Sequence, residues 1–273
     1  MIDLHVHTWR CRHAEGTPEE YVRVAARRGV STLCFTEHLP MAPSLMERIP
    51  GVEGYAMPLD ELPAYVGEVR EAAALGASLG VEVLLGIEID AVPEARRHAA
   101  SLLEAHPFDL VLASIHFIDD WAFDDPRKTA EYDRWDFGEL WERYFADLVD
   151  AARSGLADVM AHADLVKKFC KRPESPVGHM YAATAGALRE AGVAVEVNTA
   201  GLRKPCKELY PGQEFLAELH RAGVPVTIGS DAHAPDEVAL GAREAVEALR
   251  AAGYSSALVF RGRVPEEVGI DEL

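Results

Sequence analysis

The chain has 273 residues, of which 49% are hydrophobic and 26% are charged, as in an ordinary globular protein. Its formal net charge of −18 argues against non-specific binding to nucleic acid, which needs a basic surface. No run of 18 apolar residues is present, and the N-terminus lacks the basic and apolar segments of a secretory signal. We therefore expect a cytoplasmic protein that binds neither nucleic acid nor membrane.

Short β-branched runs alternate with longer amphipathic segments along the chain. The expected strands, in chain order, are 2–7, 31–38, 81–90, 110–117, 158–164, 193–200 and 224–233, with a weaker eighth at 256–262. The expected helices are 17–29, 58–80, 136–155, 175–192, 212–223 and 239–253. The first helix has the clearest boundaries, because Thr17 suits an N-cap, Pro18 suits the first turn, Glu20 completes a capping box and Gly29 ends the segment.

Repeated alternation of strand and helix predicts parallel strands joined by right-handed crossovers. The strands are near-continuous apolar runs, as expected where both faces of a sheet are buried. No glycine pattern typical of dinucleotide or P-loop binding appears, and no linker or low-complexity stretch divides the chain. We therefore predict that residues 1–273 form a single domain, a closed α/β barrel, with an open doubly wound sheet as the alternative.

Polar side chains end each of the first seven expected strands. They are His5, His7, Glu37, His38, Glu88, Asp90, His116, His162, Asp164, Glu196, Asn198, Asp231 and His233. The carboxyl ends of the strands in a parallel barrel meet on one face, so we expect these side chains to converge. Residues i and i+2 of a strand point to the same side, which lets His5 and His7 bind one ion together.

The mixture of imidazoles and carboxylates indicates a catalytic site for Zn, Fe or Mn, because no thiolate set typical of structural zinc is present. The candidates are too numerous for one ion, so two or three ions are expected. Glu88 is the natural bridging carboxylate, because its strand is central and candidate ligands precede and follow it. Cys11 is either a further ligand or, as we favour, a neutral filler, and the remaining thiols are predicted to be reduced.

A group of cations stands out in this acidic chain. It comprises Lys167, Lys168, Lys171, Arg172, Arg203, Lys204 and Lys207. Two interpretations stay open, a solvated surface or a site for an anion such as a phosphate. Four other histidines, assigned to the surface, are His98, His106, His179 and His220.

The motifs together resemble those of the polymerase and histidinol phosphatase (PHP) superfamily. They are DLHVHT at 3–8, His13, FTEH at 35–38, GIEID at 86–90, SIH at 114–116, AHADLVKKF at 161–169, EVNTAGLRK at 196–204 and GSDAH at 229–233. The segments SIHFIDDWAFD, HADLVKKF and NTAGLRK are most similar to the branch that acts on histidinol phosphate in histidine biosynthesis. The resemblance implies a distorted (β/α)7 barrel with its metal site at the carboxyl ends of the strands.

The resemblance also implies three divalent metal ions, Zn and/or Fe, with Mn as a further candidate. One ion would be held by His5, His7, Glu88 and Asp231. The second would be held by Glu88, His116 and His162, and the third by His13, His38 and His233. The implied reaction is hydrolysis of L-histidinol phosphate to L-histidinol and phosphate. The alternative is a phosphoesterase of the same superfamily that acts on another monoester or on a nucleotide.

We predict direct attack by a metal-bridging hydroxide, with Arg203 and Lys168 from the cation group completing the phosphate clamp. Asp231 or a metal-bound water would protonate the leaving alkoxide. The amine and imidazole of the substrate would be received by residues after His116, with Asp119, Asp120, Trp121 and Asp124 as candidates. The partner is thus a small-molecule phosphate monoester, and a homo-oligomer is left open.

Several nearby residues receive supporting roles. Asp3 is expected to hydrogen-bond a ligand histidine, with backbone capping as the rival role. Residues assigned to support or structure at the rim are Glu37, Asp90, Asp164 and Asn198, and those assigned to core or lid packing are Trp135, Trp141 and Tyr144. Two other protein classes are disfavoured: no strand ends in the lysine that bridges metals in amidohydrolases, and a non-catalytic module would have lost ligands.

Overall fold

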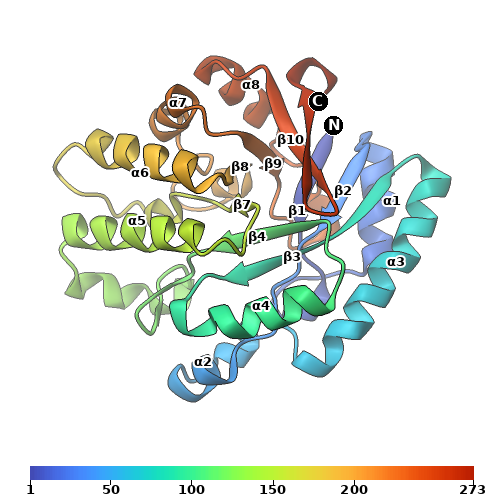
Figure 1. The fold of residues 1–273 in the computed structure, drawn as a ribbon, viewed down its shortest axis with the longest axis horizontal. Helices are drawn as coiled ribbons and strands as arrows, with labels where there is room; N and C mark the ends of the chain where they lie inside the picture. Colours follow the sequence, from blue (N-terminus) through green and yellow to red (C-terminus); the bar gives the residue numbers. More distant parts are fainter.

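The wall of the molecule is a sheet of seven parallel strands, seen in a computed structural model that describes residues 1–273 (Figure 1). The strands, in their order around the sheet, are β1 (Ile2–Val6), β2 (Thr32–Phe35), β3 (Glu82–Asp90), β4 (Leu110–Ser114), β7 (Val159–Met160), β8 (Ala194–Asn198) and β9 (Val226–Gly229). Neighbouring strands in this order pair in parallel register.

The first and last strands of the sheet meet at their carboxyl ends. The amide of His7 donates to the carbonyl of Ala232 at 2.9 Å, and the amide of Asp231 donates to the carbonyl of His5 at 2.7 Å. These bonds nearly close the sheet into a barrel just where candidate ligands leave it. The predicted distorted (β/α)7 barrel is therefore confirmed, and the open doubly wound sheet is not formed.

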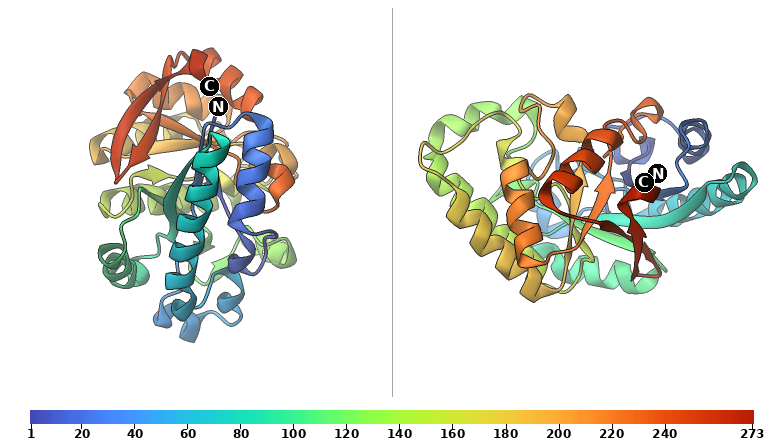
Figure 2. Two further views of the ribbon diagram at one scale, coloured as in Figure 1. Left: turned by 90° about the vertical axis from the view of Figure 1, so that its right-hand side faces the viewer. Right: turned by 90° about the horizontal axis from the view of Figure 1, so that it is seen from above.

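Helices cover the outside of the barrel (Figures 1 and 2). They are α1 (Pro18–Arg28), α3 (Leu62–Leu79), α4 (Arg96–Ala105), α5 (Phe137–Arg153), α6 (Gly178–Ala191), α7 (Gln213–Ala222) and α8 (Ala242–Ala252), with the short α2 (Pro43–Arg48) near the mouth of the barrel. The capping box of Thr17 and Glu20 opens α1 as predicted, and Gly29 ends it at φ +73°. No helix is both long enough and apolar enough to cross a membrane.

The eighth predicted strand lies outside the barrel. It is β10 (Ser256–Arg261), which pairs antiparallel with β11 (Val264–Gly269) in a C-terminal hairpin, red in Figure 1. A second small hairpin, β5 (Phe117–Ile118) with β6 (Trp121–Ala122), follows β4 on the functional side. The sequence pattern did not predict either hairpin, and it did not predict α2 or α4.

Two apolar cores hold these elements. The larger one contains 68 buried residues, among them Trp141 and Tyr144 of α5, which confirms their predicted packing role; Trp135 packs against its edge. The smaller one joins α2 to the β5–β6 hairpin through residues such as Leu45 and Phe117. This second core fixes the loops beside the carboxyl ends of the strands, where the candidate site lies.

Candidate metal centre

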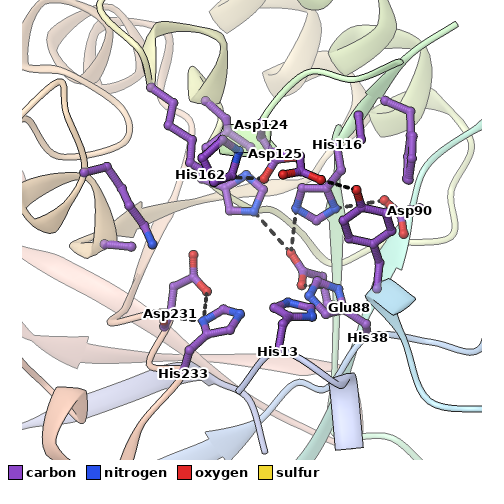
Figure 3. A pocket seen from close by; sticks show the side chains of 18 of the residues that line it. His13, His38, Glu88, Asp90, His116, Asp124, Asp125, His162, Asp231 and His233 are labelled. Carbon is purple, nitrogen blue, oxygen red and sulfur yellow. Dashed lines mark hydrogen bonds and ion pairs between the residues drawn. The ribbon is translucent and has the colours of Figure 1, made fainter. Parts of the chain in front are cut away.

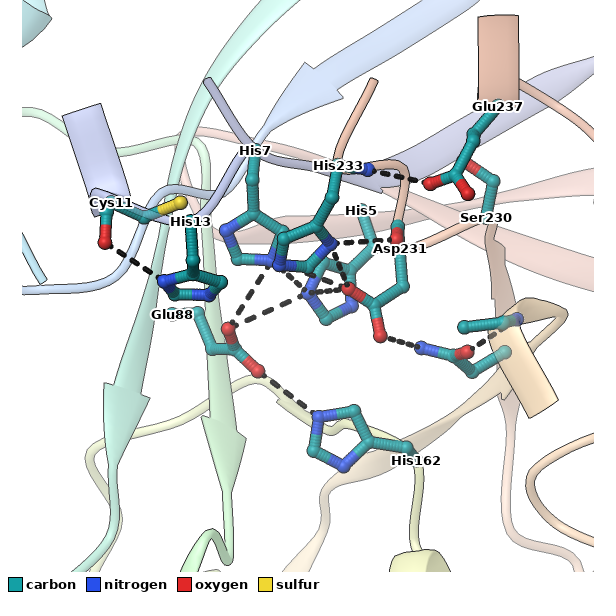
Figure 4. A network of polar contacts seen from close by, with 12 residues as sticks. His5, His7, Cys11, His13, Glu88, His162, Ser230, Asp231, His233 and Glu237 are labelled. Atoms are coloured by element: carbon teal, nitrogen blue, oxygen red, sulfur yellow. Dashed lines mark hydrogen bonds and ion pairs between the residues drawn. The ribbon is translucent and has the colours of Figure 1, made fainter. Parts of the chain in front are cut away.

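The nine residues predicted as metal ligands converge at the carboxyl ends of the strands (Figures 3 and 4). His13 arrives from the 3₁₀ turn Trp9–Cys11 after β1, whereas the other eight lie on strands or directly after them. Five groups of three residues offer ligand atoms within 4.8 Å of one another. Three of them are His5, His7 and Asp231; Glu88, His116 and His162; and His13, His38 and His233. The other two combine His7 with His38 and Glu88, and His7 with Cys11 and His233. The first three groups fall within the sets implied by the sequence resemblance, whereas the last two cross them, so the division among ions stays a prediction.

Glu88 lies between the groups and is almost completely buried. Its Oε2 atom is 3.5 Å from Nε2 of His7 and 3.0 Å from Nδ1 of His38. Its Oε1 atom is 3.2 Å from Nε2 of His162 and 3.8 Å from Nε2 of His116. A single carboxylate thus faces ligand atoms on two sides, as the predicted bridging role requires.

In most of the candidate ligand histidines, the Nδ1 atom points away from the cluster and contacts a second residue. Three imidazoles contact carboxylates through Nδ1: His5 with Glu196 at 2.7 Å, His7 with Glu37 at 3.2 Å and His116 with Asp90 at 2.8 Å. His13 and His233 donate instead to backbone carbonyls, at 2.8 Å and 3.0 Å. Because Nδ1 is occupied, Nε2 of each ring is directed to the centre, the usual device that orients metal-binding histidines.

The supporting residues named from the sequence take distinct positions. Glu37 and Asp90 hold histidines, and Asn198 donates to Oδ2 of Asp231 at 3.3 Å, so their expected proximity to the site is confirmed. Asp164 instead pairs with the buried Lys167 at 2.7 Å. The sequence interpretation gave no role to Glu196, although its position at the end of β8 was the available signal.

Two observations show that the residues suit divalent ions. The Nε2 atoms of His5 and His7 lie 3.0 Å apart on the same side of β1, close enough for both to reach one ion. Oε2 of Glu88 and Nδ1 of His162 are buried without a hydrogen bond, even though the former lies near His38. Unsatisfied buried atoms of this kind are costly, and the imidazole–carboxylate donor set is one that Zn, Fe and Mn accept.

Burial and neighbouring charges shift the pKa values of the candidate metal ligands. Burial lowers the pKa of His13 to about 4, and the adjacent His38 acts in the same direction. Burial also opposes the charged form of His7, but hydrogen bonds to Asp231 and other carboxylates raise its pKa to about 9. Burial would raise the pKa of Glu88, yet the surrounding imidazoles hold it well below its usual value. Glu88 is therefore an anion at neutral pH.

A cavity of about 430 Å³ opens over the cluster. Its cationic lining residues are Arg12, Arg127, Lys168 and Lys204. Lys168, predicted to contact substrate, lies at the wall with Nζ 3.0 Å from Oδ2 of Asp124, which also lines the cavity (Figure 3). Three of these cations, all but Lys168, received no individual role from the sequence; Lys204 was named only as a member of the cation group.

Arg203 is not among the residues that line this cavity. Its Nε donates to Glu237 at 3.1 Å, and its Nη2 donates to the carbonyls of Ser230 at 2.9 Å and Asp231 at 3.3 Å. The guanidinium therefore lies behind the turn that follows β9. Arg203 therefore does not line the cavity beside Lys168, and its contact with a phosphate stays a prediction.

Asp119 and Trp121, predicted to receive the substrate's amine and imidazole, also lie outside the cavity lining. The β5–β6 hairpin turns Asp119 outward, where it is exposed and pairs with Arg143 at 2.9 Å. Trp121 stacks on Trp135 with ring centroids 6.2 Å apart and donates to the carbonyl of Lys128. Asp120 pairs with Arg48 in the same outward direction, so only Asp124 of this group reaches the cavity.

Asp3 takes the backbone-capping role, whereas Cys11 lies beside the candidate ligands His7 and His233. Asp3 accepts hydrogen bonds from Ser230, at 2.8 Å from the amide and 2.6 Å from the hydroxyl, and contacts no imidazole ring; it fixes the end of β9. The thiol of Cys11 is near His7 but donates to the carbonyl of Thr8 at 3.3 Å. Burial raises the pKa of this thiol.

The fold and the cluster define an α/β-barrel protein with an imidazole–carboxylate centre at the carboxyl ends of its strands. Residues 3–200 match the PHP domain, and the chain belongs to this family. It is 38% identical to a probable histidinol-phosphatase of Deinococcus radiodurans over 96% of this chain and 97% of that relative. It is 27% identical to the histidinol-phosphatase of Bacillus subtilis, over 86% of this chain and 94% of that relative.

The fold is shared with a solved histidinol phosphate phosphatase from Lactococcus lactis, which is complexed with Zn, L-histidinol and phosphate. The TM-score is 0.82 at 23% sequence identity, and the match covers 97% of this chain and 98% of the other. A putative histidinol phosphatase from Listeria monocytogenes has a TM-score of 0.78 at 21% identity, over 89% of this chain and 99% of the other. These two structures agree with the barrel described above.

Proposed function

We propose that the chain is a metal-dependent phosphomonoesterase that hydrolyses L-histidinol phosphate to L-histidinol and phosphate. The observation that carries this proposal is the set of three ligand groups around the buried Glu88, beneath a cavity with four cationic side chains. Support comes from the relative in Deinococcus radiodurans, which is similar over nearly the whole chain and is named for this activity. The Lactococcus structure with L-histidinol and phosphate supports the same substrate.

The proposed metal complement is three divalent ions. The first would be held by His5, His7, Glu88 and Asp231, the second by Glu88, His116 and His162, and the third by His13, His38 and His233. Zn is favoured because the Lactococcus protein contains it, and Fe and Mn suit the same donors. When bound, such ions lower the pKa of water towards about 7 and neutralise phosphoryl oxygens.

The chain's own residues would transfer the proton and supply part of the positive charge around the phosphoryl group. In the proposed reaction the oxygen of water bonds to phosphorus, the P–O bond to histidinol breaks, and a proton must reach the leaving alkoxide. Asp231 lines the cavity, and neighbouring imidazoles hold its pKa well below the usual value although burial opposes this. As a carboxylate it would take the proton of the attacking water and pass it to the alkoxide. Lys168 would face the phosphoryl oxygens, and Asp124 would hold its ammonium.

The decisive experiment compares substrates on one metal-loaded sample. Phosphate release from L-histidinol phosphate is measured beside release from nucleoside monophosphates, and the bound metal is quantified in the same preparation. We expect a kcat/KM at least about 100-fold higher for histidinol phosphate, since several substrate groups contribute to discrimination. Equal turnover of nucleoside monophosphates would instead favour the alternative, a phosphoesterase of the same family with another substrate.

A further inference from the structure

Two adjacent cations follow β8 and point to different places. Arg203 is the last residue of the 3₁₀ turn Ala200–Arg203, and Lys204 follows it with extended backbone dihedrals (φ −94°, ψ 171°). The change from helical to extended backbone separates the directions of the two side chains. Lys204 lines the cavity over the metal centre, whereas Arg203 lies behind the turn after β9.

Lys204 differs from the other cations of the cavity wall. Each of those holds a carboxylate: Arg12 binds Glu61, Arg127 binds Asp125 and Lys168 binds Asp124. The ammonium of Lys204 makes no hydrogen bond or ion pair with any side chain, although Lys204 is partly buried. A cation without an internal partner keeps its full capacity for an incoming anion, and a phosphoryl group offers charge-assisted hydrogen bonds.

Arg203 has a different set of partners, all on the turn 230–233 or on the residue that supports it. Glu237 accepts from Nε of Arg203 at 3.1 Å. It also accepts from the backbone amide of His233 at 2.9 Å (Figure 4). Asp231 in this turn has φ +53°, in the left-handed region, which Asp adopts more readily than most residues but less readily than glycine. Arg203 and Glu237 thus brace the backbone that presents Asp231 and His233. Nη1 of Arg203 is buried without a partner, which leaves direct contact with an anion as the competing role.

We propose that the two cations divide the work: Lys204 contacts the phosphoryl group of the substrate, and Arg203 is a positioning residue for Asp231 and His233. The proposal rests on the proposed phosphomonoesterase function but not on histidinol as the leaving group. It is therefore tested with p-nitrophenyl phosphate as substrate and inorganic phosphate as inhibitor, separately from hydrolysis of histidinol phosphate. Loss of the histidinol phosphate reaction alone would overturn the substrate assignment and leave this test intact.

The test of Lys204 uses Lys204→Met, Lys204→Arg and, as a matched control, Lys207→Met. Lys207 is exposed in the same loop and does not line the cavity. In Lys204→Met we expect KM for p-nitrophenyl phosphate and Ki for inorganic phosphate to rise together by roughly 10- to 100-fold, with bound metal unchanged. Lys204→Arg should recover part of the loss, and Lys207→Met should match the parent. Unchanged KM and Ki in Lys204→Met would overturn the contact.

The test of Arg203 uses Arg203→Met and Glu237→Gln, each loaded with Co²⁺ so that the visible absorption of the ion reports its ligands. If the wild-type protein does not hydrolyse p-nitrophenyl phosphate, the dissociation constant of inorganic phosphate, measured by calorimetry, replaces KM in the tests of both Lys204 and Arg203. We expect both variants to retain fewer ions after dialysis, to show altered Co²⁺ absorption and to lose kcat by roughly 10- to 100-fold, with KM within about threefold of the parent. Excess metal should restore part of kcat. Full metal retention, unaltered absorption and a raised KM in Arg203→Met would overturn positioning and establish direct phosphate contact.

Discussion

The two ends of the barrel carry similar acidic residues but satisfy them in opposite ways. At the amino end, carboxylates that begin or precede strands are bound by the C-terminal hairpin: Arg261 to Glu82 at 2.7 and 2.6 Å, the amide of Gly262 to Asp109 at 2.9 Å, and Arg263 to Asp158 at 3.0 Å. Every one of these acids has a partner within the chain. The hairpin therefore seals this end of the barrel.

At the carboxyl end, the innermost acids face imidazoles: Glu88 contacts His38, Glu37 contacts His7 and Glu196 contacts His5. Glu88 has one oxygen buried without a hydrogen bond, and Nδ1 of His162 is buried in the same condition. The unpartnered buried atoms of Glu88 and His162 call for a ligand, whereas the paired acids of the amino end are accounted for by the fold alone.

The largest effect is expected at the shared carboxylate. Glu88→Gln removes the negative charge that lies between the ligand groups, so we expect phosphatase activity to fall more than roughly 100-fold and bound metal to fall with it. Activity assays with metal analysis measure both. Glu82→Gln at the amino end is the matched control and should keep its metal and activity. Full activity of Glu88→Gln would contradict the bridging role.

An intermediate effect is expected at Glu196, which contacts a candidate ligand but is not one itself. Glu196 accepts from Nδ1 of His5 at 2.7 Å, so Glu196→Gln changes the partner of a ligand without removing the ligand. We expect metal affinity to weaken roughly 10- to 100-fold, as is usual for such partners. Competition with a chelating dye measures the affinity. A variant that binds metal as tightly as its parent would show that the orientation of His5 is fixed by packing alone.

The smallest effect is expected at the hairpin. Arg261→Met breaks a partly exposed ion pair and should cost about 1 kcal/mol or less of unfolding free energy, with activity unchanged. The hydrogen bond from Arg261 lowers the pKa of Glu82, so this stabilisation is present above the unfolded-state pKa and is lost as the pH falls through the folded-state pKa. Urea titrations of both proteins should therefore converge below about pH 4.5. A gap that grows in acid would contradict the assignment.

Much of the barrel could be predicted from the sequence, because apolar runs, caps and helix-ending glycines agree along the chain. The exceptions have local causes. The segment of α2 is six residues long and is stabilised by the second apolar core, a tertiary effect that periodicity does not report. The last strand resembles a barrel strand in its pattern, but residues 264–269 offer it an antiparallel partner.

The metal centre was predictable for a related reason. Strand order alone brings the carboxyl ends together, so residues such as Glu88 and His116 are placed by topology. Substrate contacts depend instead on side-chain direction in loops. The β5–β6 hairpin turns Asp119 outward. A change in backbone conformation between Arg203 and Lys204 points Arg203 to the turn after β9 and away from the cavity that Lys204 lines. Closeness in sequence to a candidate ligand therefore did not reveal where the side chain of Asp119 or of Arg203 points.

The most direct test of the central claim is a metal titration of the ion-free wild-type protein. Zn²⁺ or Mn²⁺ is added stepwise while phosphate release from L-histidinol phosphate and bound metal are measured together. We predict that activity is absent without metal, rises with added ion and reaches its maximum near three bound ions per chain. Turnover that persists in protein shown to be free of metal, or metal binding that brings no phosphate release, would contradict the account.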